Sequence, residues 1–334
     1  MKKLIVARNT GFCFGVRRTV QTAERLLEKH KCLYSIGDIV HNPLVMNSLK
    51  AKGLKVVSGE REVKRGPFIV RSHGIGPDTI CRLKKRGVEI YDATCPSVKK
   101  IHSLIKKLDR KKYLIIIIGN ENHPEVVALK EYGSNVCVLR ETTSCSVKNN
   151  NSFNSRIECG GKKEATKRIE TYVEAADDAA NKTMCANSNC YKAAVIGQTT
   201  LSFKDYFKTA CSLVRCTDFK ATVVYNTICR VTGERQDESA EISRTADMVF
   251  VLGGKTSSNT AKLHQTCSRF NKRVMHIETP DELEGISLAG VESVGLISGT
   301  STPEDFIFEV KEYMKKKGYG EVRHNEHTGR RKTS

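Results

Sequence analysis

Short apolar runs recur along the chain, and each is followed by a loop rich in glycine and polar residues and then by a helical stretch. Continuous apolar runs are typical of parallel strands that are buried on both faces. Their alternation with helical stretches predicts an α/β architecture. Nine strands are expected, at residues 4–7, 32–36, 68–70, 88–91, 114–118, 193–196, 221–225, 248–252 and 294–297.

The polar loops of these nine units all follow the carboxyl ends of the expected strands, where open α/β sheets bind ligands. Along the chain the loops sort into threes, and each group holds one cysteine loop and two polar loops without cysteine. The three cysteines are Cys13, Cys95 and Cys229. The simplest geometry is three similar α/β units around a shared centre, each with a short, mainly parallel sheet and each contributing one cysteine.

Residues 141–190 interrupt this pattern, because they are rich in Asn, Ser, Thr and Lys. A surface insertion, disordered or loosely helical, is favoured there over a separate metal-binding module. The basic end of the chain after Gly318 is expected to be flexible. The predicted organisation is a first α/β domain at 14–97, a second at 98–225 that carries the insertion, a third at 1–13 plus 226–316, and a flexible basic tail at 317–334.

The chain of 334 residues has a formal net charge of +19. Such a charge suits a nucleic acid, an anionic membrane, an acidic partner or an anionic substrate. No apolar run approaches the roughly 20 residues of a membrane helix, and residues 4–7 are too short for the core of a signal peptide. We therefore expect a cytoplasmic protein without membrane association. Nucleic-acid binding is also not expected, because zinc-finger spacing and an RNP-like motif are absent. The lysine clusters at 99–112 and 311–317 are interpreted as solvated helix faces.

Thirteen cysteines, an odd number, exclude a complete set of internal disulfides. The absence of any C-x-x-C pair argues against zinc ribbons and thioredoxin-like chemistry. Three cysteines on remote loops suit an iron–sulfur cluster that has three thiolate ligands and one iron open to a substrate oxygen. The competing interpretation is ordinary buried cysteines. That interpretation is weakened because Gly11, Pro96 and Asn226 mark tight polar loops.

The loops without cysteine offer donors for an anion. Backbone N–H groups and the helix dipole favour phosphate at helix N-termini, and side-chain donors fall at such positions. These candidates are His41, His73, His123, Ser257, Ser258, Asn259 and Ser301. Glu125 is the one carboxylate in this set and the natural proton donor. The alternative for Glu125 is a first-turn glutamate that complements the helix dipole.

Taken together, the motifs resemble a known family, the LytB-like 4-hydroxy-3-methylbut-2-enyl diphosphate reductases of the non-mevalonate isoprenoid pathway. The resemblance runs from about residue 3 to about residue 316, apart from most of 141–190. The motifs occur in order as Gly11-Phe12-Cys13-Phe14-Gly15-Val16, His41-Asn42, Ser72-His73-Gly74, Asp92-Ala93-Thr94-Cys95-Pro96, His123-Pro124-Glu125-Val126, Gln198-Thr199-Thr200-Leu201, Thr227-Ile228-Cys229, Ser257-Ser258-Asn259 and Ser301.

This resemblance implies a pseudo-threefold trefoil of three α/β domains around a central [4Fe–4S] cluster bound by Cys13, Cys95 and Cys229. It implies that the substrate hydroxyl leaves as water with two electrons and two protons, giving isopentenyl and dimethylallyl diphosphates. Glu125 would relay protons and Thr199 would orient the substrate hydroxyl. His123 is placed with these two as a catalytic residue. The diphosphate would be held by His41, His73, His123, Ser257, Ser258, Asn259 and Ser301.

An acidic electron donor such as ferredoxin or flavodoxin would suit the basic surface by steering the encounter. One departure from the family is Phe14, which stands where a small residue is more common and is expected to crowd the cluster. Two alternatives to the enzyme are kept. A non-catalytic, cysteine-rich metal or redox-sensing protein would depend on the insertion cysteines Cys145, Cys159, Cys185 and Cys190. A basic RNA-binding protein would bind with a steep salt dependence.

Overall fold

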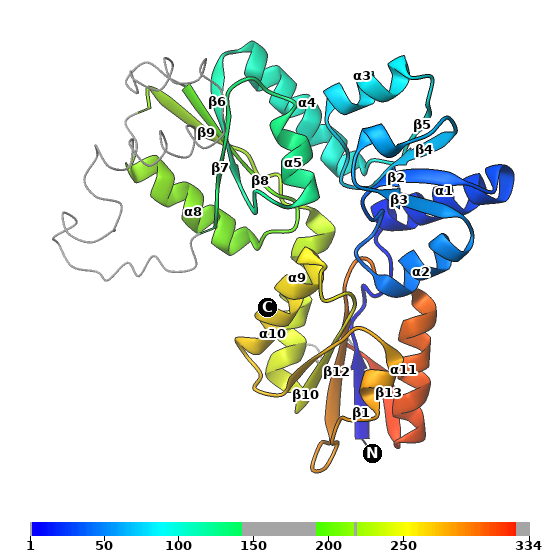
Figure 1. Ribbon diagram of the computed structural model, residues 1–334. Helices are drawn as coiled ribbons and strands as arrows, with labels where there is room; N and C mark the ends of the chain where they lie inside the picture. Colours follow the sequence, from blue (N-terminus) through cyan, green and yellow to red (C-terminus); the bar gives the residue numbers. More distant parts are fainter. Residues whose placement is uncertain (1, 142–191, 217–218, 325–334) are drawn as a thin grey trace. The chain divides into compact units, whose positions relative to one another are not determined.

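The computed structural model describes residues 2–141, 192–216 and 219–324 (Figure 1). The chain divides into two compact units. The first is built from Met1–Ser72, Leu83–Cys95 and Arg230–Ser334, and the second from His73–Arg82 and Pro96–Cys229. The first unit holds two sheets and the second holds one, and every recorded strand pairing is parallel.

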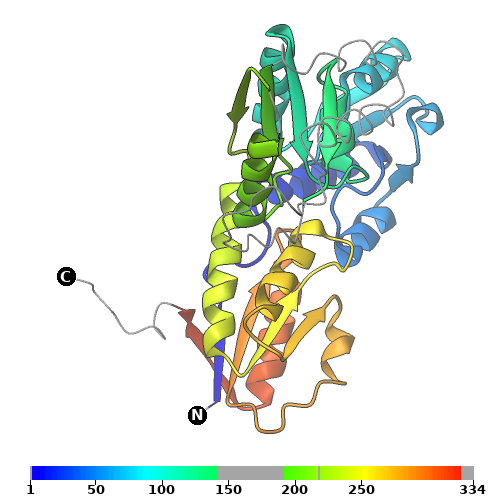
Figure 2. The ribbon, with the colours of Figure 1, turned by 90° about the vertical axis from the view of Figure 1, so that its left-hand side faces the viewer.

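The five-stranded sheet of the first unit has the order β11-β10-β12-β1-β13. Its strands are β1 (Lys2–Val6), β10 (Met248–Leu252), β11 (Val274–Ile277), β12 (Ser293–Ser298) and β13 (Tyr319–Arg323). Successive residues of a strand face opposite sides of a sheet. Leu4 therefore packs with Phe306 of one helix, whereas Ile5 packs with Ile242 of another. The covering helices are α9 (Arg230–Thr245), α10 (Ser258–Ser268) and α11 (Glu304–Lys316), with the short 3-10 helix η3 (Pro280–Leu283) at one edge. Figure 2 shows α9 running alongside β1.

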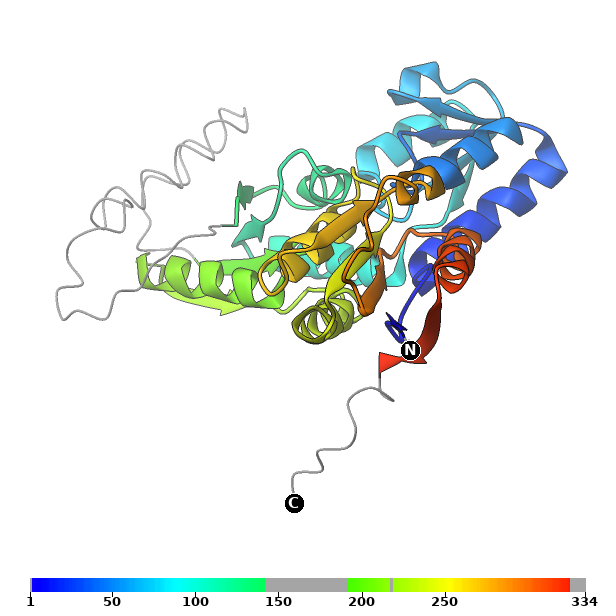
Figure 3. The same ribbon diagram turned by 90° about the horizontal axis from the view of Figure 1, so that it is seen from below.

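The four-stranded sheet of the first unit has the order β3-β2-β4-β5. Its strands are β2 (Leu33–Ile36), β3 (Leu54–Val57), β4 (Pro67–Val70) and β5 (Glu89–Asp92), and its helical elements are α1 (Phe14–His30), α2 (Pro43–Ala51), η1 (Glu60–Glu62) and α3 (Pro77–Lys85). Val20 and Leu27 of α1 and Leu49 of α2 share one core with Leu33. In Figure 3, α11 lies beside α1, and Arg17 of α1 forms a 2.6 Å ion pair with Glu304 there.

The sheet of the second unit has the order β7-β6-β8-β9. Its strands are β6 (Tyr113–Ile118), β7 (Val136–Leu139), β8 (Lys192–Gly197) and β9 (Ala221–Val224), and its helices are α4 (Pro96–Arg110), α5 (Pro124–Lys130) and α8 (Phe203–Cys216). Ile115 and Ile117 face a core shared with α4 and α5, whereas Ile116 packs with Tyr206 of α8. This central strand is buried on both faces, as its continuous apolar sequence predicts.

All three sheets share one topology. The fourth strand in each order, β5, β9 or β1, is followed by a loop with a cysteine, and the second and third strands are followed by the polar loops without one. Each sheet therefore contributes Cys95, Cys229 or Cys13. The prediction of three similar α/β units with parallel sheets is confirmed. The boundaries of the three expected domains remain predictions.

The nine expected strands are all present, and four further strands were not expected: β3, β7, β11 and β13. Strand β13 lies within residues 317–334, so the expectation of a flexible tail is wrong for Tyr319–Arg323. This segment pairs with β1 along its length. Tyr319 is buried, and its hydroxyl donates a 2.7 Å hydrogen bond to the carbonyl of Val291.

The expected insertion at 141–190 lies, apart from Glu141, outside the described residues, and so do Cys145, Cys159, Cys185 and Cys190. Across the three described stretches, no helix combines the length and the apolar composition that crossing a bilayer needs.

Candidate functional site

The three cysteines occupy equivalent positions, each directly before a helix: Cys13 before α1, Cys95 before α4 and Cys229 before α9. Their backbone N–H groups make equivalent hydrogen bonds of 3.0 Å. Each donates to a carbonyl in the loop after the third strand of its sheet, from Cys13 to Thr300, from Cys95 to Ser72 and from Cys229 to Thr199. The positive end of a helix dipole favours negative charge on a sulfur placed there. The backbone thus presents three thiol groups at sites that suit thiolate ligands.

Gly15 explains how two of these sulfurs can approach each other within the first unit. A Cβ atom on Gly15 would lie 2.7 Å from the sulfur of Cys95 and 3.9 Å from that of Cys13. Both sulfurs therefore border the space that glycine leaves open. The glycine is required by this close approach rather than by its backbone conformation, since it lies inside α1.

We predict that Gly15→Ala preserves the fold but weakens the retention of any group bound by Cys95. The added methyl group would displace the Cys95 sulfur, and overpacking of this kind costs about 1–3 kcal/mol. Gly233→Ala is the matched control, because Gly233 is also helical and nothing lies within 4 Å of its missing Cβ. The measurement is iron content per chain after reconstitution, together with the melting temperature. Equal iron content in both variants would contradict the role assigned to Gly15.

Arg235 of α9 ties the loop of Cys13 to the loop after β12. The side chain is only 4% exposed. Its guanidinium donates to the carbonyls of Ser298 at 3.0 Å and Gly11 at 2.8 Å, and the Gly11 N–H donates to the Ser298 hydroxyl at 2.8 Å. The sequence pattern did not single out Arg235, because an arginine on a polar helix is normally exposed. What marks Arg235 is that its charged side chain is buried, and this burial can be known only from the folded structure.

Glu125 and Thr199 form an enclosed polar pair in the second unit. Glu125 lies in the first turn of α5, and it is 1% exposed. The Thr199 N–H donates to Oε1 of Glu125 at 2.8 Å, and the Thr199 hydroxyl donates to Oε2 at 2.6 Å. Burial raises the pKa of Glu125, and the two hydrogen bonds from Thr199 oppose this with a smaller effect. The carboxyl group therefore stays protonated to a higher pH than a solvated glutamate, which suits a proton donor.

The raised pKa of Glu125 also predicts a pH-dependent stability. The folded state holds this proton more tightly than the unfolded state, so the contribution is fully present below the ordinary glutamate pKa of 4.5 and is lost as the pH rises through the folded-state value. Glu125→Gln removes the titration. We expect the melting temperature of the variant, relative to the unsubstituted protein, to increase between pH 4.5 and pH 8 in cluster-free samples. A constant difference across this range would contradict the raised pKa.

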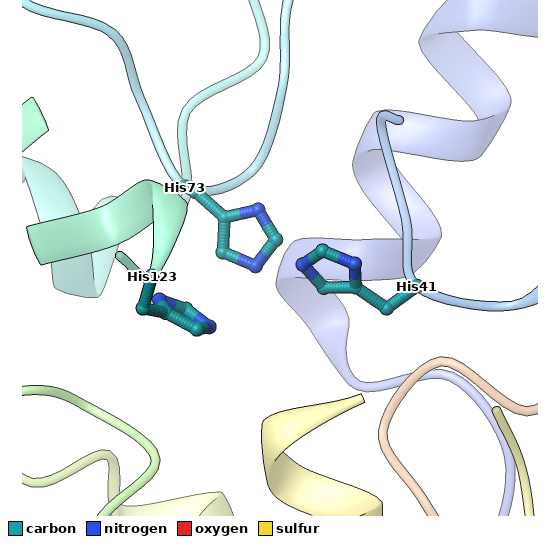
Figure 4. A group of neighbouring side chains, drawn as sticks. All are labelled: His41, His73 and His123. Carbon is teal, nitrogen blue, oxygen red and sulfur yellow. The ribbon is translucent and has the colours of Figure 1, made fainter. Parts of the chain in front are cut away.

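The expected histidines divide between the two units. In the second unit, His73 lies on the loop after β4 and His123 at the start of α5, with their rings perpendicular and their centroids 5.3 Å apart (Figure 4). Nδ1 of His123 caps the helix by accepting the Glu125 N–H at 3.2 Å. In the first unit, His41 lies on the loop between β2 and α2. Burial lowers the pKa of His41, Arg71 lowers it further, and Asp38 raises it by less.

The first unit brings the loop of His41 against the polar loops of the five-stranded sheet. The Ser301 hydroxyl donates to the His41 carbonyl at 3.3 Å. A Cβ atom on Gly254 would lie only 2.3 Å from the same carbonyl oxygen. Ser257 caps α10 through its hydroxyl, which accepts the Thr260 N–H. These contacts gather expected ligand donors from both sheets of the unit. Ser258 is the first residue of the same helix.

Asn259 gives the clearest sign of a polar ligand. The residue is 3% exposed, and neither the oxygen nor the nitrogen of its side-chain amide has a hydrogen-bond partner among the described residues. Leaving such a group buried and unsatisfied costs about 1–3 kcal/mol. A polar ligand that reaches this amide would remove the cost.

Phe14 follows Cys13 directly, and its side chain is 69% exposed. The expected crowding of the cluster by this side chain stays a prediction.

The fold and these loops define a class: parallel α/β proteins of three similar sheets, in which each sheet places one cysteine at a helix N-terminus beside loops suited to an anion. The chain matches the family model described as LytB protein over residues 4–315. It belongs to the LytB family, which confirms the resemblance found in the motifs.

Relatives and solved structures agree with this assignment. A 4-hydroxy-3-methylbut-2-enyl diphosphate reductase of Kosmotoga olearia is 35% identical over 332 residues, covering 97% of this chain and 98% of the relative. The enzyme of that name from Caldanaerobacter subterraneus is 33% identical over 318 residues, covering 94% and 96%. A solved (E)-4-hydroxy-3-methyl-but-2-enyl diphosphate reductase, described as the terminal enzyme of the non-mevalonate pathway, has a TM-score of 0.61 at 30% identity and covers 95% and 100%. The Plasmodium falciparum reductase structure, with a TM-score of 0.75 at 24% identity and coverage of 96% and 91%, supports the fold.

Proposed function

We propose that the protein catalyses the reductive dehydroxylation of (E)-4-hydroxy-3-methylbut-2-enyl diphosphate to isopentenyl and dimethylallyl diphosphates. Membership of the LytB family and the names of the relatives support the reaction. The observation that carries the chemistry is the buried Glu125 carboxyl with the Thr199 hydroxyl 2.6 Å from its Oε2. The pair is a proton source enclosed by protein. Removal of a poor leaving group such as hydroxide needs such a proton source.

The cysteine loops fit an iron–sulfur cluster. Thiolates are the usual ligands of such clusters, the three cysteines sit at helix N-termini, and Gly15 keeps the space beside two of the sulfurs clear. Cys13, Cys95 and Cys229 would hold a [4Fe–4S] cluster. When bound, the cluster would supply the electrons and a Lewis-acidic position for the substrate hydroxyl group.

The protein's own residues account for binding and for proton delivery. The diphosphate would be held by His41, His73, His123, Ser257, Ser258, Asn259 and Ser301, and its binding energy would fix the allylic alcohol near Thr199. Hydroxide is a poor leaving group, so the oxygen needs a proton as the carbon–oxygen bond breaks. The Thr199 hydroxyl would give its own proton to this oxygen and would accept the proton of the Glu125 carboxyl group from Oε2. His123 would support the transfer by holding the Glu125 N–H through Nδ1.

The overall reaction consumes two electrons and two protons. One proton leaves with the hydroxyl group as water, and the other forms a new carbon–hydrogen bond. Because the allylic intermediate can accept the second proton at either of two carbons, two products result. An acidic ferredoxin or flavodoxin would provide the electrons. The cytoplasmic location remains a prediction from the sequence.

The test is anaerobic purification and reconstitution with iron and sulfide, followed by absorbance and EPR spectra before and after dithionite. Turnover of the hydroxylated diphosphate is then measured with dithionite-reduced methyl viologen, and both products are quantified. A reducible cluster with substrate-dependent spectra and both products would support the proposal. A chain that cannot be reconstituted, or a cluster without turnover, would refute it.

A further inference from the structure

Helix α4 presents a basic face that the proposed reaction has not used. Its apolar side chains are buried against the second unit's sheet. Its exposed side carries Lys100, Lys106, Lys107 and Arg110, and Lys111 and Lys112 follow directly. The helix contains one acidic residue, Asp109, whose Oδ1 accepts hydrogen bonds from the Ser134 N–H and hydroxyl, both at 2.7 Å.

Several of these charges are unfavourably placed for the isolated helix. Lysines suit a helix C-terminus, but Lys99 and Lys100 lie near the N-terminus, where the dipole favours acidic residues. Lys106 and Arg110 are four positions apart, as are Lys107 and Lys111, and like charges at this spacing destabilise a helix by tenths of a kcal/mol. The dipole favours Lys107 and Arg110 in the last turn, so local stability accounts for only part of this face, whereas attraction to an acidic partner accounts for all of it.

One lysine of this face is held in place. Nζ of Lys106 lies 5.2 Å from the ring centroid of Tyr132. The same ring stacks on His102 of α4 at 3.9 Å, and its hydroxyl donates to the Ile75 carbonyl. A cation on an anchored ring loses less side-chain freedom when a partner binds, which favours recognition.

The helix also has a defined relation to the cysteine loops, since Cys95 directly precedes Pro96, its first residue. At a rise of 1.5 Å per residue, the basic face extends from the first turn beyond Cys95 to about 20 Å along the axis. This length suits one side of a small protein–protein interface of about 800 Å².

We propose that the exposed basic face of α4 is the docking surface for an acidic electron-transfer protein, which delivers electrons beside Cys95. The inference rests on the proposed function, because only a reductase needs such a partner. The charge complementarity between this surface and the acidic partner sets the encounter rate. The position of Cys95 directly before the helix sets where the electrons enter.

The test compares two double charge reversals in the reconstituted enzyme. Lys100→Glu with Lys107→Glu alters the α4 face. Lys315→Glu with Lys316→Glu, on the exposed end of α11, changes the net charge equally elsewhere. For the α4 variant we expect KM for a reduced acidic [2Fe–2S] ferredoxin to rise about tenfold or more and to lose most of its salt dependence. Turnover with methyl viologen should stay unchanged in both variants.

Equal effects of the two variants on KM for ferredoxin, or no effect of the α4 variant, would overturn the docking surface. Failure of the unsubstituted enzyme with methyl viologen would instead refute the proposed function. In that case, calorimetric titration of the reconstituted protein with oxidised ferredoxin still tests the surface, because binding needs no turnover. If the α4 variant loses salt-sensitive RNA binding but binds ferredoxin normally, the face belongs to a nucleic acid and the docking proposal fails.

Discussion

Replacing Glu125 with glutamine is expected to lower kcat by about 10²–10⁴-fold, the usual contribution of a positioned general acid. Glutamine keeps the shape of the side chain and can still pair with Thr199, so the loop should remain in place. It cannot release a proton at neutral pH. The KM for the diphosphate and the iron content should therefore change little, while product formation with methyl viologen falls.

The control for this variant is Glu121→Gln in the same loop region. Glu121 is partly exposed and pairs with Arg140 at 3.1 Å, so its charge is removed without touching the buried pair. Turnover by Glu125→Gln at the rate of the Glu121→Gln control would remove Glu125 from the proton path. Loss of iron together with activity would instead mean that the carboxyl group supports the fold of the site.

Replacing Cys95 with serine is expected to reduce iron retention from about four atoms per chain to less than about one. Serine has no thiolate, so one of three protein ligands is lost. Activity should fall by at least about 100-fold, because loss of a ligand costs more than the 10–100-fold typical of groups that merely support one. Iron and sulfide analysis and the EPR spectrum of the reduced protein measure the effect.

Cys137→Ser is the matched control, because Cys137 lies buried in β7, at the sheet edge opposite the strand that precedes the Cys229 loop. Its cluster content should match that of the unsubstituted chain. Serine variants distinguish the reductase from the alternative of a metal or redox-sensing protein. The cysteines to replace are those of the insertion, Cys145, Cys159, Cys185 and Cys190. If only these variants lost iron, the protein would be a cysteine-rich metal or redox sensor rather than the proposed reductase.

Every strand that the sequence missed lies at a sheet edge, whereas all of the interior strands and the edge strands β5 and β9 were predicted. Ile115 to Ile118 form a run of four isoleucines, all buried, and such a run is recognisable in any central strand. The missed strands β3, β7, β11 and β13 are edge strands. An edge strand pairs on one side only and tolerates polar residues. Strand β13, with the sequence YGEVR, carries no apolar run.

The site shows a similar division between local and tertiary information. The cysteines and Glu125 were accessible to sequence reasoning because each stands in, or directly after, a polar loop at a strand end. The hydrogen bonds of Arg235 could not be predicted from the sequence, because they link Gly11 and Ser298, which are far apart in the chain. The clearance at Gly15 depends in the same way on how closely Cys95 approaches α1. Such features arise only when separate segments pack.

The three equivalent hydrogen bonds from the cysteine N–H groups have a consequence for spectroscopy. Their acceptors are the carbonyls of Thr300, Ser72 and Thr199, and the first two directly precede the expected diphosphate ligands Ser301 and His73. A ligand that pulls on these loops would shift the backbone of the cysteines. The electronic spectrum of the proposed cluster would then report diphosphate occupancy, even in a variant that cannot turn over.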